Sequence, residues 1–203
     1  IGYYIKALKI YELHNDRKSI SYIQNKSGLV YYFLGNYEKA LEFWKESLGY
    51  YQVSNDKEGQ AYLLNNIGLI YEKEGKYDSA LVNHQLSLKI KEELNDRSGI
   101  SGSINNIGNI YFYQEDYQHA IDYWLLALKI KEEINEKPGI TNTLQNIGYG
   151  YYELKEFEKG LEYVNKGLKV ALEINHKHYI KEAYVKLADI YSEMKNFEKA
   201  YEY

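Results

Sequence analysis

The sequence contains no cysteine, one proline and one methionine among its 203 residues. Without cysteine the chain can form no disulfide bond, no thiolate metal site and no cysteine nucleophile, and this is compatible with a reducing compartment. Long hydrophobic runs are also missing, and the mean hydropathy is -0.59, so we expect no membrane-spanning segment. The first residues, IGYYIKALKIYEL, lack the features of a signal peptide, and we therefore predict a cytoplasmic protein.

An excess of positive charge is absent as well. The net charge is -4 and the isoelectric point is near 5.8, so neither nucleic acid nor a membrane surface is predicted as a partner. No nucleophile with a neighbouring base, acidic pair or metal-ligand cluster recurs in one place, and His176 and His178 lack a third ligand at metal-binding spacing. We therefore predict no catalytic residue, no metal, no cofactor and no enzymatic activity.

What the sequence does contain is an internal repeat. Glycines lie at 28, 68, 108 and 148, a spacing of 40 residues, and the next position in the series is Ala188. The same spacing relates two further sets of residues, one of tyrosines and one of small residues. These are Tyr31, Tyr71, Tyr111, Tyr151 and Tyr191, and Ala40, Ala80, Ala120, Gly160 and Ala200. The repeat covers the whole chain.

Within each repeat the apolar spacing predicts two helices separated by short turns. In the second repeat the helices are expected over residues 57–74 and 77–94. The chain as a whole should therefore contain eleven helical segments and no strand, with full helices near 17 residues. Gly35 and Gly75 suit a left-handed residue after a helix, whereas Glu115, Lys155 and Lys195 hold that place later, so the turn does not require glycine.

The motif Ile67-Gly68-x-x-Tyr71 followed by Ala80, and its copy around Gly108, resembles the tetratricopeptide repeat. The resemblance implies an all-α, right-handed superhelical solenoid of antiparallel helix pairs. The 40-residue period exceeds the usual 34 and resembles arrays of bacterial signalling proteins, Leu-Gly-Asn repeat proteins and kinesin light chains. In such arrays the small residues allow close helix packing, so the glycines should lie at helix crossings. His84 shares the position of Trp44 and Trp124 and is predicted to be a buried core histidine.

We predict a single array over residues 1–203. It comprises the second helix of a preceding unit at 1–14, four units from about residues 18, 57, 97 and 137, and a partial unit at 178–203. Neither end carries a polar capping helix, and apolar residues near the ends, such as Leu8, Leu187 and Phe197, lack a complete partner helix. The chain is therefore expected to be part of a longer protein or to associate end to end.

A second face of the first helix in each unit carries the candidate binding residues. At about 100° per residue, Ile67, Gly68 and Tyr71 lie on the packing face, and Asn66 and Leu69 lie opposite, with Asn65 at the margin. In the resembling family this second face lines the concave groove in which ligands bind. The predicted peptide-binding residues are Tyr62, Asn65, Asn66, Leu69, Lys73, Asn105, Asn106, Asn109, Tyr113, Asn142, Gln145, Asn146 and Tyr149.

A row of carboxamides matches the donors and acceptors of an extended peptide backbone, and interleaved aromatic rings would add contact area. We therefore predict a scaffold that binds a protein or peptide partner. Two alternatives stay open. The Asn residues could instead hydrogen-bond neighbouring repeats, and the array could serve as a sensory or dimerisation region of a larger bacterial signalling protein such as a sensor histidine kinase.

Overall fold

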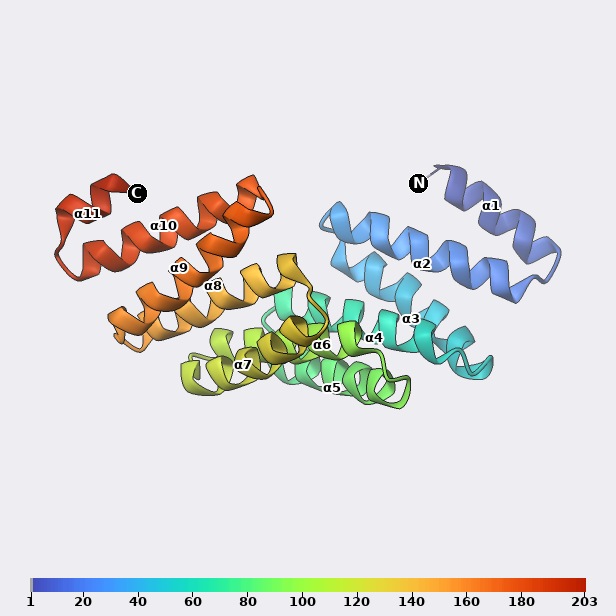
Figure 1. Ribbon diagram of the computed structural model, residues 1–203. Coiled ribbons are helices and arrows are strands. Elements are labelled where there is room, and N and C mark those ends of the chain that lie inside the picture. Colours follow the sequence, from blue (N-terminus) through green and yellow to red (C-terminus); the bar gives the residue numbers. More distant parts are fainter. Residues whose placement is uncertain (1) are drawn as a thin grey trace. The chain divides into compact units, whose positions relative to one another are not determined.

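The computed structural model describes residues 2–203, except for the side chain at position 5, so the first residue of the predicted segment 1–14 lies outside the described residues. Within that range the chain forms eleven helices and no strand (Figure 1). Their bounds are α1 Gly2–Leu13, α2 Arg17–Phe33, α3 Tyr37–Val53, α4 Lys57–Lys73, α5 Tyr77–Glu93, α6 Arg97–Tyr113, α7 Tyr117–Glu133, α8 Lys137–Glu153, α9 Phe157–Glu173, α10 Lys177–Glu193 and α11 Phe197–Glu202. Every helix from α2 to α10 has 17 residues, which confirms the predicted number and length.

The chain divides into two compact units, Ile1–Asp96 and Arg97–Tyr203, here called unit 1 and unit 2. In unit 1 each helix from α1 to α5 packs against the next. In unit 2 the same holds from α6 to α11, and α8 also contacts α10. Both units are therefore built from antiparallel helix pairs in which each new pair packs on the previous one.

The turns between helices follow one local design. Side chains such as those of Asp16, Asn36 and Asp56 accept a hydrogen bond from the backbone N–H three residues later and so cap the next helix. The residue after each C-cap has a positive φ, which is 70° at Gly75 but also 63° at Lys155, where a side chain is present. The structure thus confirms that this turn does not require glycine.

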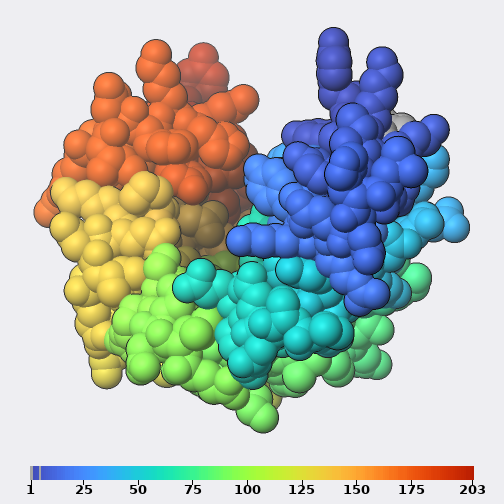
Figure 2. Space-filling view, turned by 90° about the vertical axis from the view of Figure 1, so that its right-hand side faces the viewer, coloured from blue at the N-terminus to red at the C-terminus, as the bar shows by residue number. Residues whose placement is uncertain are grey.

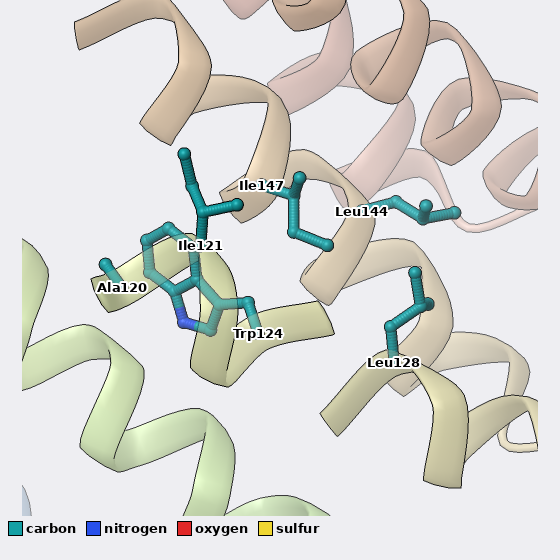
Figure 3. Close-up of a cluster of buried hydrophobic side chains, with 6 residues drawn as sticks. All are labelled: Ala120, Ile121, Trp124, Leu128, Leu144 and Ile147. Carbon is teal, nitrogen blue, oxygen red and sulfur yellow. The ribbon is translucent and has the colours of Figure 1, made fainter. Parts of the chain in front are cut away.

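One hydrophobic core cluster of unit 2 forms between α7 and α8. Figure 3 shows Ile121 of α7 facing Ile147 of α8 and the ring of Trp124 beside Ala120 and Ile121, within a cluster that also includes Leu128 and Leu144. An equivalent cluster in unit 1 joins α3 to α4 through Trp44, Leu63 and Ile70. The second helix of one pair therefore shares its core with the first helix of the next.

The glycines of the repeat lie where two helices cross. A Cβ atom on Gly108 would lie 2.7 Å from Cδ1 of Trp124, and one on Gly68 would lie 2.8 Å from Cε1 of His84. Only hydrogen fits between the helix backbone and these rings. His84 is fully buried, so the predicted core histidine and the predicted glycine crossings are both confirmed.

Apolar side chains are exposed near both ends of the chain. Tyr3 is 89% exposed and Phe197 67% exposed, and Figure 2 shows deep-blue side chains of α1 projecting from the surface of unit 1. Leu187, in contrast, is fully buried in a cluster between α9 and α10, so the expectation that it leaves apolar surface uncovered was wrong, although α11 has only 6 residues. End-to-end association stays a prediction.

In residues 2–203 no helix combines the length and the apolar character that crossing a membrane needs.

Candidate functional site

Unit 2 contains a pocket of about 260 Å³ between the first helices of two successive pairs. It is lined by Asn109, Phe112 and Tyr113 of α6, Trp124 of α7, and Asn142, Asn146 and Tyr149 of α8. Five of these side chains belong to the set predicted from the sequence: Asn109, Tyr113, Asn142, Asn146 and Tyr149. The structure therefore brings part of that set together around one cavity, which we call the amide pocket.

The side-chain amides of this pocket differ in their hydrogen bonding. Asn109 accepts a hydrogen bond through Oδ1 from Nε1 of Trp124 at 3.0 Å, which fixes its orientation and leaves its NH2 group as a donor. Asn142 and Asn146 are half-buried, and among residues 2–203 neither side chain has a hydrogen-bond partner. Two amides with full hydrogen-bonding capacity thus stand at the wall of a cavity.

Aromatic rings form the rest of the wall. The ring centroid of Phe112 lies 5.7 Å from that of Trp124 and 5.6 Å from that of Tyr149. Tyr149 stacks in turn on Tyr152 at 5.2 Å. Contacts of this kind hold the rings in place, so the pocket offers rigid apolar area beside the amides.

The side chains of three other predicted residues already contact other residues of the chain. Oδ1 of Asn105 accepts hydrogen bonds from Nζ of Lys131 and from the hydroxyl of Thr143, at 3.2 and 3.0 Å. Gln145 is 1% exposed and donates through Nε2 to the carbonyl of Tyr179 at 2.9 Å. Asn65, at the same repeat position, contacts the ring of His84 at 3.2 Å. Asn105 and Gln145 thus bond to the next repeat, as the alternative interpretation of the carboxamides predicts, whereas Asn65 bonds within its own repeat.

Lys131 is 6% exposed, and its ammonium donates to Thr143 at 2.8 Å as well as to Asn105. Burial lowers the pKa of Lys131, because the charged form loses hydration, although the carboxylate of Glu136 raises it. This lysine belongs to the packed interior and not to the pocket wall.

Replacing Lys131 with methionine is expected to raise the melting temperature by a few degrees, about 1 kcal/mol of added stability. The substitution removes a buried charge, and Thr143 continues to donate to Asn105. Thermal unfolding followed by circular dichroism measures the change, with Lys169→Met on the exposed side of α9 as the control. A lower melting temperature would mean that the two hydrogen bonds of the ammonium outweigh its desolvation.

The remaining predicted residues divide between the units. In unit 1, Tyr62 is 46% exposed and Lys73 is also exposed, Asn65 and Leu69 are half-buried, and Asn66 is 9% exposed with no hydrogen-bond partner for Nδ2 among the described residues. In unit 2, Asn106 is half-buried on α6. These side chains lie outside the amide pocket.

Two pocket residues were not predicted. Phe112 and Trp124 complete the wall, and both could have been found from the repeat. Phe112 shares its position with Tyr32 and Tyr152, and Trp124 shares its position with Trp44. An aromatic residue repeated at such a position indicates packing, and only the structure shows that these two rings also line a pocket.

A family model described as the tetratricopeptide repeat matches residues 19–93 and 100–173, and a second model with the same description matches residues 181–203. The chain belongs to the tetratricopeptide repeat family. Together the two models cover most of the array, including every helix of the amide pocket. No curated protein sequence matches the array.

Solved structures share this fold. The array resembles a signal transduction ATPase with numerous domains that has a tetratricopeptide repeat sensor, from Pyrococcus horikoshii, with 26% identity, a TM-score of 0.83, and coverage of 97% of this chain and 31% of that one. Aspartyl phosphate phosphatase F from Bacillus subtilis gives 18% identity, a TM-score of 0.82, and 98% and 61% coverage. The Rap conjugation gene regulator of plasmid pLS20, in complex with the Phr* peptide, has 18% identity and a TM-score of 0.75. The match covers 92% of this chain and 52% of that one. The array spans less than two thirds of each of these proteins.

Proposed function

We propose that the array is a protein-interaction scaffold that binds an extended peptide segment, and that the amide pocket of unit 2 is a principal contact. The observation that carries this proposal is the pair Asn142 and Asn146, whose side chains have no hydrogen-bond partner among the described residues although they stand at the wall of the pocket. Each side-chain amide can donate to the carbonyl and accept from the N–H of a peptide backbone, because it offers two donors and one carbonyl acceptor. An extended backbone laid across α8 satisfies both.

The aromatic rings give the second part of the support. Phe112 and Tyr149 present rigid surface beside the amides, and rings of this kind contribute strongly to binding because little side-chain entropy is lost. The pLS20 Rap regulator, which shares the fold, has a solved structure in complex with the Phr* peptide. A peptide ligand therefore accords with both the chemistry of the pocket and one similar structure.

The double substitution Asn142→Ala, Asn146→Ala is expected to weaken peptide binding roughly tenfold or more, because each lost hydrogen bond contributes about 0.5–1.5 kcal/mol. Binding peptides are first selected by probing a set of 12-residue sequences with the full 203-residue chain. The affinities of the selected peptides, carrying a fluorescent label, are then measured by fluorescence anisotropy. The control is Asn165→Ala, which removes an amide that bonds only to the carbonyl of Leu161 in its own helix. Equal affinities for the double variant and the unchanged chain would refute a role for the pocket.

A second candidate function is that of a sensor region within a larger signalling protein. The Pyrococcus protein favours it, because its tetratricopeptide repeat sensor belongs to a signal transduction ATPase of which this array covers 31%. Sequencing the gene on both sides of the region that encodes the array tests this directly. A signalling domain in the same reading frame would support the sensor function, and its absence would leave the scaffold function alone.

A further inference from the structure

A second cavity, of about 370 Å³, lies in unit 1 between α2 and α3, the two helices of the first repeat (Figure 1). It is lined by Arg17, Ile20 and Gln24 of α2, and by Glu46, Gly49, Tyr50, Val53 and Ser54 at the C-terminal end of α3. Because the two helices are antiparallel, Arg17 stands opposite Val53 at one end of the cavity and Gln24 opposite Glu46 at the other. There Nε2 of Gln24 donates a hydrogen bond to Glu46 at 2.5 Å. We call this cavity the Arg17 pocket.

The Arg17 end of the pocket has only half of an ion pair that the later repeats have in full. In those repeats the first residue of the first helix pairs with the last residue of the second helix: Lys57 with Glu93 at 3.3 Å, Arg97 with Glu133, and Lys137 with Glu173 at 3.4 Å. In the first repeat the last residue of α3 is Val53, and the side chain of Arg17 has no ion pair or hydrogen bond within residues 2–203. The adjacent Asp16 does not replace the glutamate, because its carboxylate accepts hydrogen bonds from the N–H and the hydroxyl of Ser19. The first repeat thus keeps the cation without its carboxylate.

Smaller residues in the first repeat create the space of the pocket. Gly49 stands where later repeats have Lys89, Lys129 and Lys169, and Ser54 stands where they have Leu94, Ile134 and Ile174. A Cβ atom on Gly49 would meet nothing within 4 Å, so no other described side chain fills the space beside it. The volume of the pocket lies within the range of sites that bind small organic molecules, roughly 300–1,000 Å³.

The two ends of the pocket differ in charge, and its middle is apolar. Ile20 and Tyr50 lie one helical turn from the guanidinium end, and Glu46 lies two turns from it, about 10 Å away along the helix. Burial raises the pKa of Glu46, and the charges of Glu42 and Glu12 raise it further, although the hydrogen bond from Gln24 lowers it. A ligand with one negative charge is therefore attracted at Arg17, and a second negative charge at its other end would be repelled by Glu46.

We propose that the Arg17 pocket binds a small organic monocarboxylate, whose carboxylate pairs with Arg17 and whose apolar body lies against Ile20 and Tyr50. The ligand thus supplies the carboxylate that a glutamate supplies in the later repeats. A guanidinium suits this contact, since it binds a carboxylate with two parallel donors, and the apolar body gains free energy by leaving water. The site shares no residue with the amide pocket, so the inference goes beyond the proposed function.

The test measures the affinity of the full chain for octanoate and three related probes by isothermal titration calorimetry, at neutral pH and at low and moderate salt. Octanamide keeps the apolar body without the charge, acetate keeps the charge without the body, and suberate has the same length with a carboxylate at each end. Octanoate is expected to bind about tenfold more tightly than each of the other three. Its advantage over octanamide should shrink as the salt concentration rises, because salt screens the ion pair.

Two variants test the role of the guanidinium. Val53→Glu gives Arg17 the internal partner found in the later repeats, and it should weaken octanoate binding about tenfold without lowering the melting temperature, because Val53 is 82% exposed. Arg17→Gln should weaken binding to a similar extent. The matched control is Lys57→Gln, which removes the equivalent cation of the second repeat, already paired with Glu93, and should leave octanoate binding unchanged.

Three outcomes would overturn the inference: octanamide that binds as tightly as octanoate, an octanoate affinity that Val53→Glu leaves unchanged, or no binding of any probe. Each of them leaves the proposed function standing, because that function depends on Asn142 and Asn146 and is tested with peptides.

Discussion

Replacing Gly108 with leucine is expected to destabilise unit 2 by about 3 kcal/mol or more, because overpacking at a helix crossing displaces both helices. A single added carbon would lie 2.7 Å from Cδ1 of Trp124 and 3.2 Å from the carbonyl oxygen of Ala120. The indole cannot move away freely, since its Nε1 donates to Asn109 and to the carbonyl of Asn105. Leucine adds three further carbons to the same space.

The same helix supplies a control for this prediction. Gly102 also lies within α6, but a Cβ atom there would meet nothing within 4 Å. Gly102→Ala should therefore stabilise the chain slightly, by up to about 1 kcal/mol, because alanine favours the helix. Urea unfolding of the full chain measures both variants. Similar unfolding midpoints for the leucine variant and the unchanged chain would show that α6 and α7 do not cross at Gly108 as the structure has them.

Damage at Gly108 should also reach the amide pocket. Trp124 lines the pocket and orients Asn109, so a displaced indole changes both the shape of the cavity and one of its amides. Neighbouring pairs in a repeat array stabilise one another, so local unfolding should begin at α6 and α7. Hydrogen exchange measured by mass spectrometry would locate that loss of protection.

The helices and their packing could be predicted from the sequence because the repeat reports each position several times. A glycine at 28, 68, 108 and 148 identifies a crossing more securely than any one of these residues could. The turns were predictable for the same reason, since Glu115 and Lys155 share the place of Gly75. What the repeat conveys is the average environment of a position, and this was sufficient for the fold.

The pocket was predicted only in part because a helical wheel gives direction and not depth. Asn105 and Asn109 are four residues apart and point in similar directions, yet Asn105 is 7% exposed against Lys131 and Thr143, whereas Asn109 reaches the pocket. For a residue at the margin of the packing face, the size of the side chains on the next helix decides which neighbouring residues it contacts. Buried charges such as Lys131 could not be foreseen either, because their burial depends on hydrogen-bond acceptors on two other helices.

Acidification is expected to destabilise unit 1 through the second repeat, where a histidine replaces the tryptophan found in its neighbours. Burial lowers the pKa of His84 from 6.5 to about 4, with a smaller contribution from the charge of Lys91. Between pH 6.5 and about 4 the folded state therefore keeps His84 neutral, whereas the same imidazole is protonated in the unfolded chain. The stability is fully present above pH 6.5 and is lost as the pH falls from 6.5 toward 4, by up to about 3 kcal/mol.

Acidification has the opposite effect on stability through Glu72. It is 8% exposed, and burial raises its pKa above 4.5, although the charge of Lys73 lowers it. A buried carboxyl with a raised pKa destabilises the fold at neutral pH, and this cost is relieved as the pH falls through the raised pKa toward 4.5. Oε2 of Glu72 and Nε2 of His84 both lack a hydrogen-bond partner among the described residues, so neither group is stabilised in its charged form by such a contact.

The double substitution Glu72→Phe, His84→Trp should remove both contributions, because it gives the second repeat the pair that stands in the third. There Phe112 and Trp124 pack with centroids 5.7 Å apart, and the first repeat has Tyr32 and Trp44 at 5.8 Å. Urea unfolding of the full chain between pH 7 and pH 4 is the measurement. We expect the variant to be more stable at pH 7 by roughly 2 kcal/mol or more, since two buried polar groups with unpaired atoms are replaced by apolar rings.

Comparison with single variants separates the two groups. His84→Trp alone should lose the acid destabilisation but retain the cost of Glu72 at neutral pH, so its stability should rise as the pH falls toward 5. His14→Gln removes an exposed histidine and should keep the acid sensitivity of the unchanged chain. If the double variant lost as much stability between pH 7 and pH 4 as the unchanged chain does, the sensitivity would lie in other carboxylates, and the burial of a neutral His84 would not be its cause.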